Sequence, residues 1–394
     1  MAQRSTRQYS IELLRAVAIT AIAIFHTFLP YNETAEALSH IYNGGALTAL
    51  GWIGFLGAAG NHVFFLISGY FLIPRCAQAL THPSWAAFRA QCAKSFGRAL
   101  RLLAILLFYA LILLAISTWI VPLPGISATS LSWLGMNLEF IWLYIVFIAI
   151  TPIVALLWQA APKHRSTIVL VLFVLTYLIN GYIAFVSPDD AARSLLSWRK
   201  LMSGWTYCMT YVGGAALSDW TRKRPLSRRG CRAALIVVAA FSIAVCGVYA
   251  VSNSVDMLIA LSYKSTSLIS FLLALTAFCF AQTYTNQPKR SVGTTIVLKT
   301  AQSTLAFYII QSLSWTSWQA FIGAALVGIL ASAPVSWGSF FGIGILFSAA
   351  FIAVATLFDQ LIRIPLFNLI RRHTGSVNSL SHFLQPGSRP GSRS

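Results

Sequence analysis

Charged residues are scarce in this sequence, and acidic residues are the scarcest. Of the 394 residues, 9% are charged and 57% are hydrophobic, whereas about a quarter of the residues of a soluble protein carry a charge. This imbalance excludes a soluble enzyme, a disordered chain and a fibrous repeat. A membrane-spanning helix needs about 20 mostly apolar residues, and such runs recur along the chain. The composition therefore predicts an all-α polytopic membrane protein.

The cysteines exclude two further kinds of site. The sequence contains six cysteines and no CxxC pair, so a redox or metal centre built on cysteine is not expected. Three of them occupy apolar runs, where a thiol packs as a small core residue, namely Cys208, Cys246 and Cys279. The other three lie in segments expected to face the reducing cytoplasm, namely Cys76, Cys92 and Cys231. We therefore predict no disulfide framework and no metal site.

The apolar runs predict about ten transmembrane helices. The predicted spans are residues 11–30, 50–73, 99–120, 132–158, 166–187, 203–221, 233–252, 265–284, 301–331 and 335–362. Residues 1–372 thus form one transmembrane domain. Residues 373–394 are rich in Ser, Gly, Arg and Pro, a composition typical of a flexible tail. An even number of spans places both termini on the same side.

The basic residues indicate which side that is. The formal net charge is +19, from 28 Lys and Arg against 9 Asp and Glu. On a soluble protein this excess would indicate nucleic-acid binding, but here the positive residues lie between apolar runs, as the positive-inside rule describes. With the N-terminus in the cytoplasm, the basic residues left outside are Arg193, Arg199, Lys200 and Lys264. We expect cytoplasmic termini, membrane lipids and not nucleic acid as partners, and a place in the cell membrane, the inner membrane of a bacterium.

The first span carries ionisable residues at depths where each costs about 2.5–3.5 kcal/mol. Arg15 and His26 are 11 residues apart, which is about 20° beyond three full turns and about 16 Å of rise. Both side chains therefore lie on one stripe, Arg15 near the cytoplasmic surface and His26 in the outer half. Such a pair could line a polar passage. Alternatively, Arg15 extends to the interface and His26 bonds a neighbouring helix. Glu12, one turn before Arg15, is expected to pair with it.

The second span and the loop after it carry further polar residues. Asn61, His62 and Ser68 interrupt the apolar run. The pair Ser68-Gly69 is typical of close helix packing in membranes, and small residues also let a ligand approach the backbone. The basic loop ends in Arg98-x-x-Arg101, which either anchors the topology or binds a phosphorylated cytoplasmic ligand.

Glu139 is the only carboxylate that we place well inside a predicted span. Its depth in the outer third of the fourth span is comparable with that of His26. A carboxylate beside an imidazole orients it and raises its basicity. The alternatives are a simple counter-charge or a protonated, uncharged side chain.

Two of these patterns resemble motifs of the membrane-bound acyltransferase-3 family. Glu12-x-x-Arg15-x10-His26 is similar to the family's Arg-x10-His motif, and Phe64-Phe65-Leu66-Ile67-Ser68-Gly69-Tyr70 to its Phe-Phe-x-x-Ser-Gly-aromatic motif. The resemblance extends to Arg98-x-x-Arg101, to Trp142 and Pro152, and to the stretch 305–311. Two departures occur, because Phe140 and Gln311 stand where family members often have histidine.

The resemblance implies an O-acyltransferase. Members of the family move an acyl group, usually acetyl from cytoplasmic acetyl-CoA, onto a hydroxyl of a surface glycan, a lipid-linked sugar or a similar acceptor. It implies His26 as the base or acyl carrier, and we predict Glu139 as a second catalytic residue from its depth. The donor contacts that it implies are Arg15, Ser68, Gly69, Arg98 and Arg101. The chain has no room for the extracytoplasmic hydrolase-like domain of some members.

Two other functions also need polar residues inside a helical membrane domain. A secondary transporter would use them for coupling or substrate binding, and a glycan flippase would use them to line a cavity. The paired motifs of the first two spans argue against both. No pair of Gly- or Pro-broken helices at matching positions in two halves is visible in the sequence.

Overall fold

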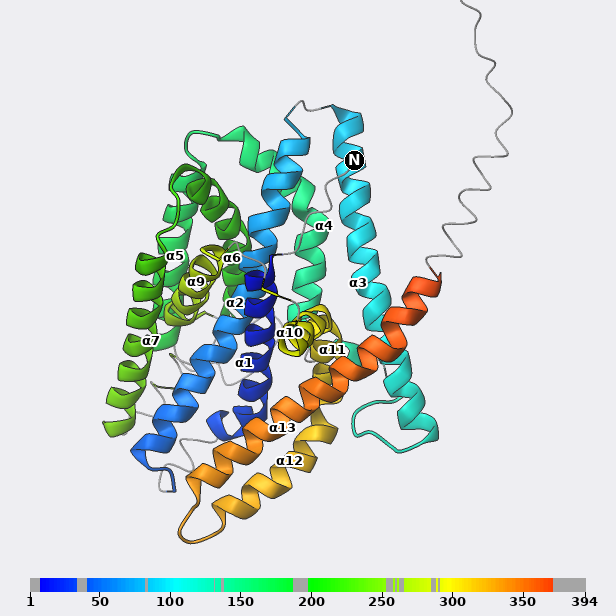
Figure 1. The fold of residues 1–394 in the computed structure, drawn as a ribbon, viewed down its shortest axis with the longest axis vertical. Helices are drawn as coiled ribbons and strands as arrows, with labels where there is room; N and C mark the ends of the chain where they lie inside the picture. The colour runs from blue at the N-terminus through cyan, green and yellow to red at the C-terminus, as the bar shows by residue number, and fades with distance from the viewer. Residues whose placement is uncertain are drawn as a thin grey trace, which may run out of the picture.

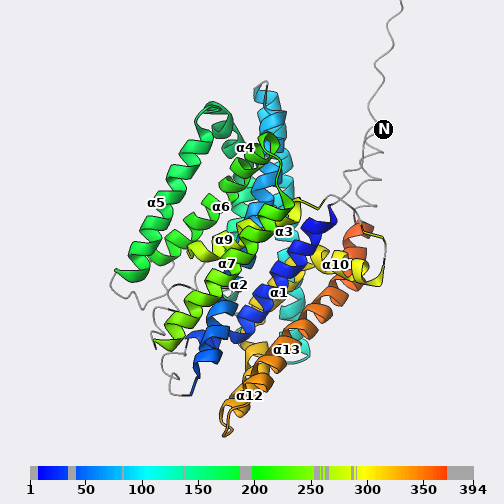
Figure 2. The same cartoon turned by 60° about the vertical axis from the view of Figure 1, so that its left-hand side comes forward.

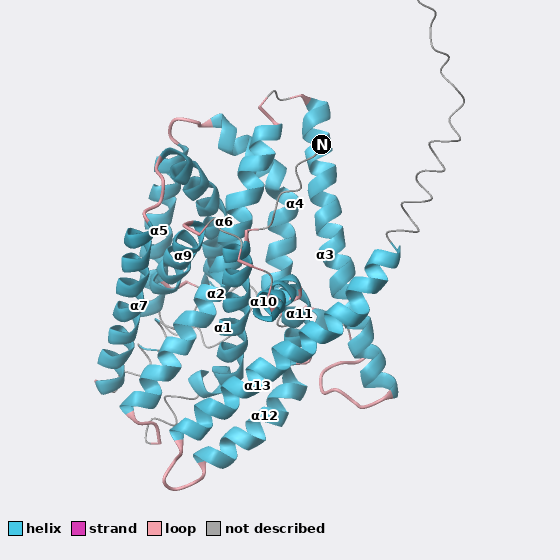
Figure 3. Cartoon of the chain, in the orientation of Figure 1, coloured by secondary structure: helices cyan, strands magenta, loops and turns pink. Residues whose placement is uncertain are grey.

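The computed structural model describes residues 8–33, 41–81, 84–130, 132–135, 138–186, 198–252, 258, 261, 266–284, 288–289 and 291–370. Throughout these residues every regular element is helical (Figure 3), which confirms the predicted all-α membrane fold. The predicted tail 373–394 lies outside the described residues. So do several charges of the topology prediction, namely Arg4, Arg7, Glu36, Asp189, Asp190, Arg193, Asp256, Lys264, Arg290, Arg371 and Arg372.

Figure 1 shows the helices coloured along the chain. In chain order they are α1 Tyr9–Glu33, α2 Gly44–Ala79, α3 Trp85–Trp119, α4 Glu139–Ala160, α5 Arg165–Phe185, α6 Trp198–Lys223, α7 Arg228–Val251, α9 Leu268–Gln282, α10 Val292–Gln302, α11 Thr304–Leu313, α12 Trp315–Leu330 and α13 Trp337–Phe358. The short 3₁₀ helix η1, Ser132–Leu134, precedes α4, and the π-helical turn η2, Asp359–Arg363, continues α13.

Each predicted span coincides with a helix or with a pair of helices. In the part of the chain that is described, seven helices are long and apolar enough to cross a membrane. The predicted span 301–331 is instead a bent pair, in which α11 and α12 meet at 80°. The predicted span 265–284 is the shorter apolar helix α9, and the predicted span 203–221 lies in α6, which is not among the seven. The sequence pattern does not predict α10. The total of ten crossings, and the side on which each end lies, remain predictions.

Helix α2 is the centre of the bundle, and it packs against α1, α4, α6, α7 and α9. Its glycines let the neighbouring backbones approach. A Cβ atom built on Gly60 would lie 2.7 Å from the carbonyl oxygen of Ala18 on α1, and one built on Gly69 would lie 1.7 Å from that of Tyr211 on α6. Small residues at such crossings are the usual device of membrane helix packing. They bring α1, with its polar stripe, directly against the middle of the protein.

Helix α13 runs along α1 on the side away from α6 (Figure 2). The two helices are joined at mid-length by a hydrogen bond of 2.8 Å between the hydroxyl oxygens of Thr27 and Ser348. Gly344, one turn before Ser348 on α13, packs against the ring of Phe28 on α1. A Cβ atom at this position would lie only 2.3 Å from that ring, so a larger residue would not fit. Helix α1 is therefore enclosed by α2 on one side and α13 on another.

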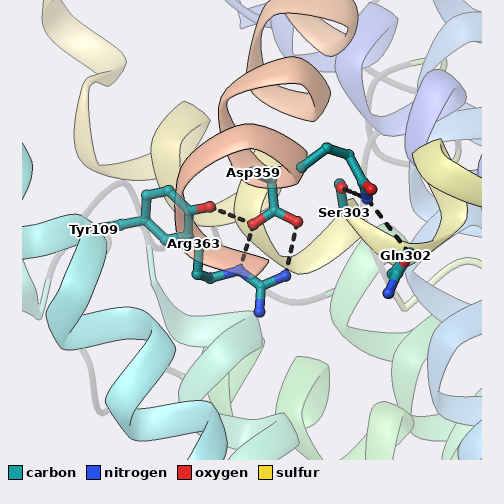
Figure 4. A network of polar contacts seen from close by, with 6 residues as sticks. Tyr109, Gln302, Ser303, Asp359 and Arg363 are labelled. Atoms are coloured by element: carbon teal, nitrogen blue, oxygen red, sulfur yellow. Dashed lines mark hydrogen bonds and ion pairs between the residues drawn. The ribbon is translucent and has the colours of Figure 1, made fainter. Parts of the chain in front are cut away.

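A buried carboxylate ties the end of α13 to the rest of the bundle (Figure 4). Asp359 accepts hydrogen bonds from the hydroxyl of Tyr109 on α3 and from Nε and Nη2 of Arg363. Gln360 donates from Nε2 to Oγ of Ser303, 3.1 Å away, between α10 and α11. Asp359 lies near the end of the predicted span 335–362, and its charge is matched one turn later by Arg363.

The structure predicts that the packing at Gly69 tolerates no side chain. Gly69→Ala should lower the yield of folded protein and destabilise it by at least about 1–3 kcal/mol, the usual cost of overpacking, because the backbone of α6 cannot move away without repacking α2. Thermal unfolding in detergent measures the change. Gly247→Ala on α7 is the matched control, since nothing would lie within 4 Å of a Cβ atom at that position and alanine is the better helix former. Equal stability of the two variants would contradict this packing.

A second prediction concerns the Asp359–Arg363 pair. Arg363→Met should destabilise the fold by about 3–5 kcal/mol, because it leaves Asp359 buried without its charged partner. The double variant Asp359→Leu with Arg363→Met should recover part of that loss, since no charge then remains buried. Lys94→Met removes an exposed charge on α3 and is the control, expected to stay within about 0.5 kcal/mol. A double variant that is less stable than Arg363→Met would argue against this account of the pair.

Candidate active site

A cavity of about 230 Å³ lies where α1, α2, α3, α4, α10 and α11 meet. Its lining residues are Glu12, Arg15, Ile19, Phe64, Ser68, Leu102, Phe140, Ile141, Tyr144, Ala301, Gln302, Thr304, Leu305 and Tyr308. Helices α1 and α11 enter it from the same end, so Glu12 and Arg15 lie beside the start of α11. The rings of Phe140 and Tyr308 are at the opposite end, with centroids 4.8 Å apart. The cavity is therefore polar and charged at one end and aromatic at the other.

The charged end is formed by a pair within α1. Arg15 Nη1 lies 3.2 Å from Glu12 Oε1, and the two side chains are 31% and 6% exposed. This confirms the predicted pairing across one helical turn. The second carboxylate oxygen of Glu12 is buried and has no hydrogen-bond partner among the described residues. The guanidinium of Arg15 keeps further N–H donors for an anionic or carbonyl group that enters the cavity.

Ser68 lies in the wall of the same cavity. This agrees with the prediction that a ligand could approach the backbone at Ser68-Gly69. Its Oγ lies 2.8 Å from the hydroxyl of Tyr144 on α4, which also lines the cavity. Sequence reasoning missed Tyr144, because a tyrosine in an aromatic transmembrane run gives no sign of which face it occupies. The two hydroxyls together offer donors and acceptors halfway along the cavity.

His26 lies just beyond the aromatic end. Its ring centroid is 6.2 Å from that of Tyr308, which lines the cavity, and 5.6 Å from that of Trp315. Its Nδ1 lies 2.9 Å from Oε1 of Gln311 on α11. Arg15 and His26 therefore both face α11, and the single stripe predicted from their spacing is confirmed. The cavity and the imidazole share Tyr308 as their common wall.

The backbone carbonyl of His26 also has a hydrogen-bond partner outside α1. The sequence explains why it is free to accept one. The residue four positions later is Pro30, which has no N–H to donate to the carbonyl oxygen of His26. Gln319 of α12 fills that place, since its Nε2 donates to this oxygen at 2.6 Å. A buried carbonyl without a partner would be costly. The bent pair α11–α12 thus holds both the ring and the backbone of His26.

Glu139 does not contact His26. It is the first residue of α4, and its carboxylate forms an ion pair with Lys200 of α6. Of the alternatives left open for Glu139, the structure shows the counter-charge, and Gln311 occupies the position at Nδ1 of His26. Glu139 and Lys200 lie at the same end of their helices, as the predicted topology requires. A catalytic role of Glu139 stays a prediction.

The remaining predicted donor contacts do not line the cavity. Gly69 faces the backbone of α6. Arg98 and Arg101 lie on α3 with exposed side chains, and the next residue, Leu102, is the one that reaches the cavity wall. Their exposure leaves both arginines accessible to a ligand that extends out of the cavity. Direct donor contacts of these three residues stay predictions.

The second intramembrane histidine has a different environment. His62 is buried on α2, and its Nδ1 lies 2.9 Å from the hydroxyl oxygen of Thr210 on α6. The rings of Tyr207 and Phe271 lie against it, and it is not part of the cavity lining. Within the described residues, no group of three or more His, Cys, Asp or Glu side chains could hold a metal ion.

An open apolar groove lies at the end of α1, one helical turn beyond His26. It has a volume of about 590 Å³ and runs between the end of α1 and α12. Its lining residues are Pro30, Tyr31, Ile41, Gln319, Gly323, Val327, Leu330 and Ala331. Gln319 belongs to the groove and also bonds the backbone of His26. Gln319 therefore links the groove to the backbone of His26, whereas Tyr308 links the imidazole to the cavity.

These features define a multi-pass membrane protein with a partly buried imidazole near a polar cavity and an apolar groove. A family model for acyltransferase-3, described as an acyltransferase domain, matches residues 8–370, which is nearly the whole chain. The chain therefore belongs to that family and is a membrane acyltransferase. No curated protein and no solved structure matches it.

Proposed function

We propose that the protein is an O-acyltransferase that moves an acyl group, most simply acetyl, from cytoplasmic acyl-CoA to a hydroxyl on the other side of the membrane. The acceptor is a surface glycan, a lipid-linked sugar or a similar molecule. The observation that carries this proposal is the cavity that begins at Arg15 and ends at Tyr308, against the imidazole of His26. In this arrangement a donor bound from one side delivers its acyl group to the only histidine beside the cavity among the described residues.

The charge distribution favours a CoA thioester as the donor. The phosphates of CoA would remain at the cytoplasmic surface, where Arg98 and Arg101 are exposed on α3, and arginine binds phosphate well. The uncharged arm would enter past Arg15 into a cavity whose inner walls are largely aromatic. Along this path Ser68 and Tyr144 present hydroxyl groups to the amides or the thioester carbonyl. This assignment needs no metal.

His26 supplies the chemistry that acyl transfer to a hydroxyl requires. As a base, it takes the proton of the acceptor hydroxyl while the oxygen attacks the thioester carbonyl. The C–S bond then breaks, and the CoA thiolate leaves and takes the proton back from the imidazolium. As an acyl carrier, the imidazole itself attacks the thioester carbonyl, and the C–S bond breaks to leave an acyl-imidazolium and the CoA thiolate. The acceptor hydroxyl then attacks the acyl carbon, the bond to the imidazole breaks, and the hydroxyl proton passes to the thiolate. Both routes return neutral His26 and produce one ester and one CoA.

The groove beside His26 supports a membrane-borne acceptor. Its walls are mainly apolar side chains of α1 and α12, which suit a lipid chain better than a free sugar. Among the acceptor classes, a lipid-linked glycan is therefore the first to test. In this proposal the acceptor approaches His26 from the groove, and the donor approaches it from the cavity. Such a protein would reside in the cell membrane with its donor side in the cytoplasm.

The proposal predicts that transfer depends on His26. Membranes containing the protein should move label from acyl-labelled acetyl-CoA into glycan or lipid-linked products. His26→Gln should lower the rate at least about 100-fold, the usual contribution of a general base. His62→Gln is the matched control, a second intramembrane histidine that should keep the rate per folded molecule.

The outcomes separate the alternatives. Equal rates for His26→Gln and the wild type would remove His26 as base and carrier. Label found on the wild-type protein in the absence of acceptor, and lost in His26→Gln, would establish the carrier route. If neither lipid-linked nor soluble acceptors receive an acyl group, but the membranes take up solute, the protein is a transporter and the proposal is wrong.

A further inference from the structure

We infer that Gln311 is a positioning residue that holds the imidazole of His26 with its proton on Nδ1 and its lone pair on Nε2. The inference rests on the proposed role of His26 in acyl transfer and deepens it. Gln311 is 1% exposed on the last full turn of α11. Its Oε1 lies 2.9 Å from Nδ1 of His26.

The break between α11 and α12 is what fixes Gln311. Helix α11 ends at Leu313, and the chain turns by 80° into α12. This turn brings the indole of Trp318 back to Gln311, and its Nε1 donates to the carbonyl oxygen of Gln311 at 2.8 Å. The backbone of Gln311 is thus held by α12 while its side chain reaches α1. A straight helix would place Trp318 about 10 Å further along the axis.

The hydrogen bond selects one form of the ring. A carbonyl oxygen only accepts, so its partner Nδ1 must carry the hydrogen. In a neutral imidazole the other nitrogen, Nε2, then has the lone pair. Only that form can take a proton or attack a carbonyl through Nε2. The opposite form would present N–H there and would be inactive as a base.

The aromatic side chains around His26 restrict its ring without competing for Nδ1. The rings of Phe25, Tyr308 and Trp315 lie at centroid distances of 5.4, 6.2 and 5.6 Å from the imidazole. The backbone is held separately through Gln319. Gln311 is also uncharged, so it orients the imidazole without stabilising its positive form as a carboxylate would. A neutral base is the form that the proposed reaction needs.

The first test is spectroscopic and needs no substrate. Protein labelled with ¹⁵N-histidine in lipid bilayers at pH 7.5 gives separate nitrogen signals for the two ring forms, and His26→Gln identifies those of His26. The wild type should show a protonated Nδ1 and an unprotonated Nε2. Gln311→Leu should lose this preference, whereas Gln311→Glu, which keeps an acceptor oxygen, should retain a protonated Nδ1. Gln319→Leu, the matched control, removes only the backbone contact and should leave the ring form unchanged.

The second test is kinetic. Gln311→Leu should lower kcat by about 10- to 100-fold, the range found when a partner that orients a histidine is removed, with KM for the donor changed less than about threefold. Gln311→Glu should recover part of kcat. An unprotonated Nδ1 in the wild type, or ring signals that Gln311→Leu leaves unchanged, would overturn the inference. If the ring form responds as expected but the wild type transfers no acyl group, the proposed function fails and the positioning contact stands.

Discussion

The organisation of the protein depends on the need to satisfy polar side chains that α1 carries into the hydrocarbon. Each ionisable group there costs about 2.5–3.5 kcal/mol unless it finds a partner or a wet cavity. Glu12 and Arg15 pair with each other at the mouth of the cavity, and His26 bonds Gln311. Helix α11 bonds His26 and shares the cavity with Glu12 and Arg15. The glycines of α2 and the contact with α13 cover two other faces of α1.

The bent pair α11–α12 makes this arrangement possible. Because the helix is broken, two different segments can contact His26. Tyr308 and Gln311 of α11 approach its ring. Gln319 of α12 approaches its backbone. Non-helical backbone at membrane depth is tolerated where it is buried in protein, and broken helices commonly mark binding sites in membrane proteins. Pro30 adds to the effect, because it frees the carbonyl that Gln319 then takes.

Local geometry made part of this structure predictable. The stripe of Arg15 and His26, and the pairing with Glu12, follow from residue spacing along one helix, and apolar runs located the spans. The partner of Nδ1 and the hydroxyl beside Ser68 could not be read, because Gln311 and Tyr144 lie on helices far away in sequence. The partner of Glu139 could not be read for the same reason, since Lys200 lies on another helix. The 80° bend left no clear hydropathy signal, because the apolar run continues through it. The short helix α10 was not predicted either.

The central claim is that an acyl donor occupies the cavity between Arg15 and Tyr308 and presents its acyl group to His26. Photo-crosslinking with an acyl-CoA that carries a diazirine in its acyl chain, followed by peptide mapping, tests this claim directly. The account predicts label on the facing segments of α1 and α11 near His26 and Tyr308, and its loss when excess acetyl-CoA competes. Label confined to the groove of Tyr31 and Val327, or label on these helices that acetyl-CoA does not displace, would contradict the account.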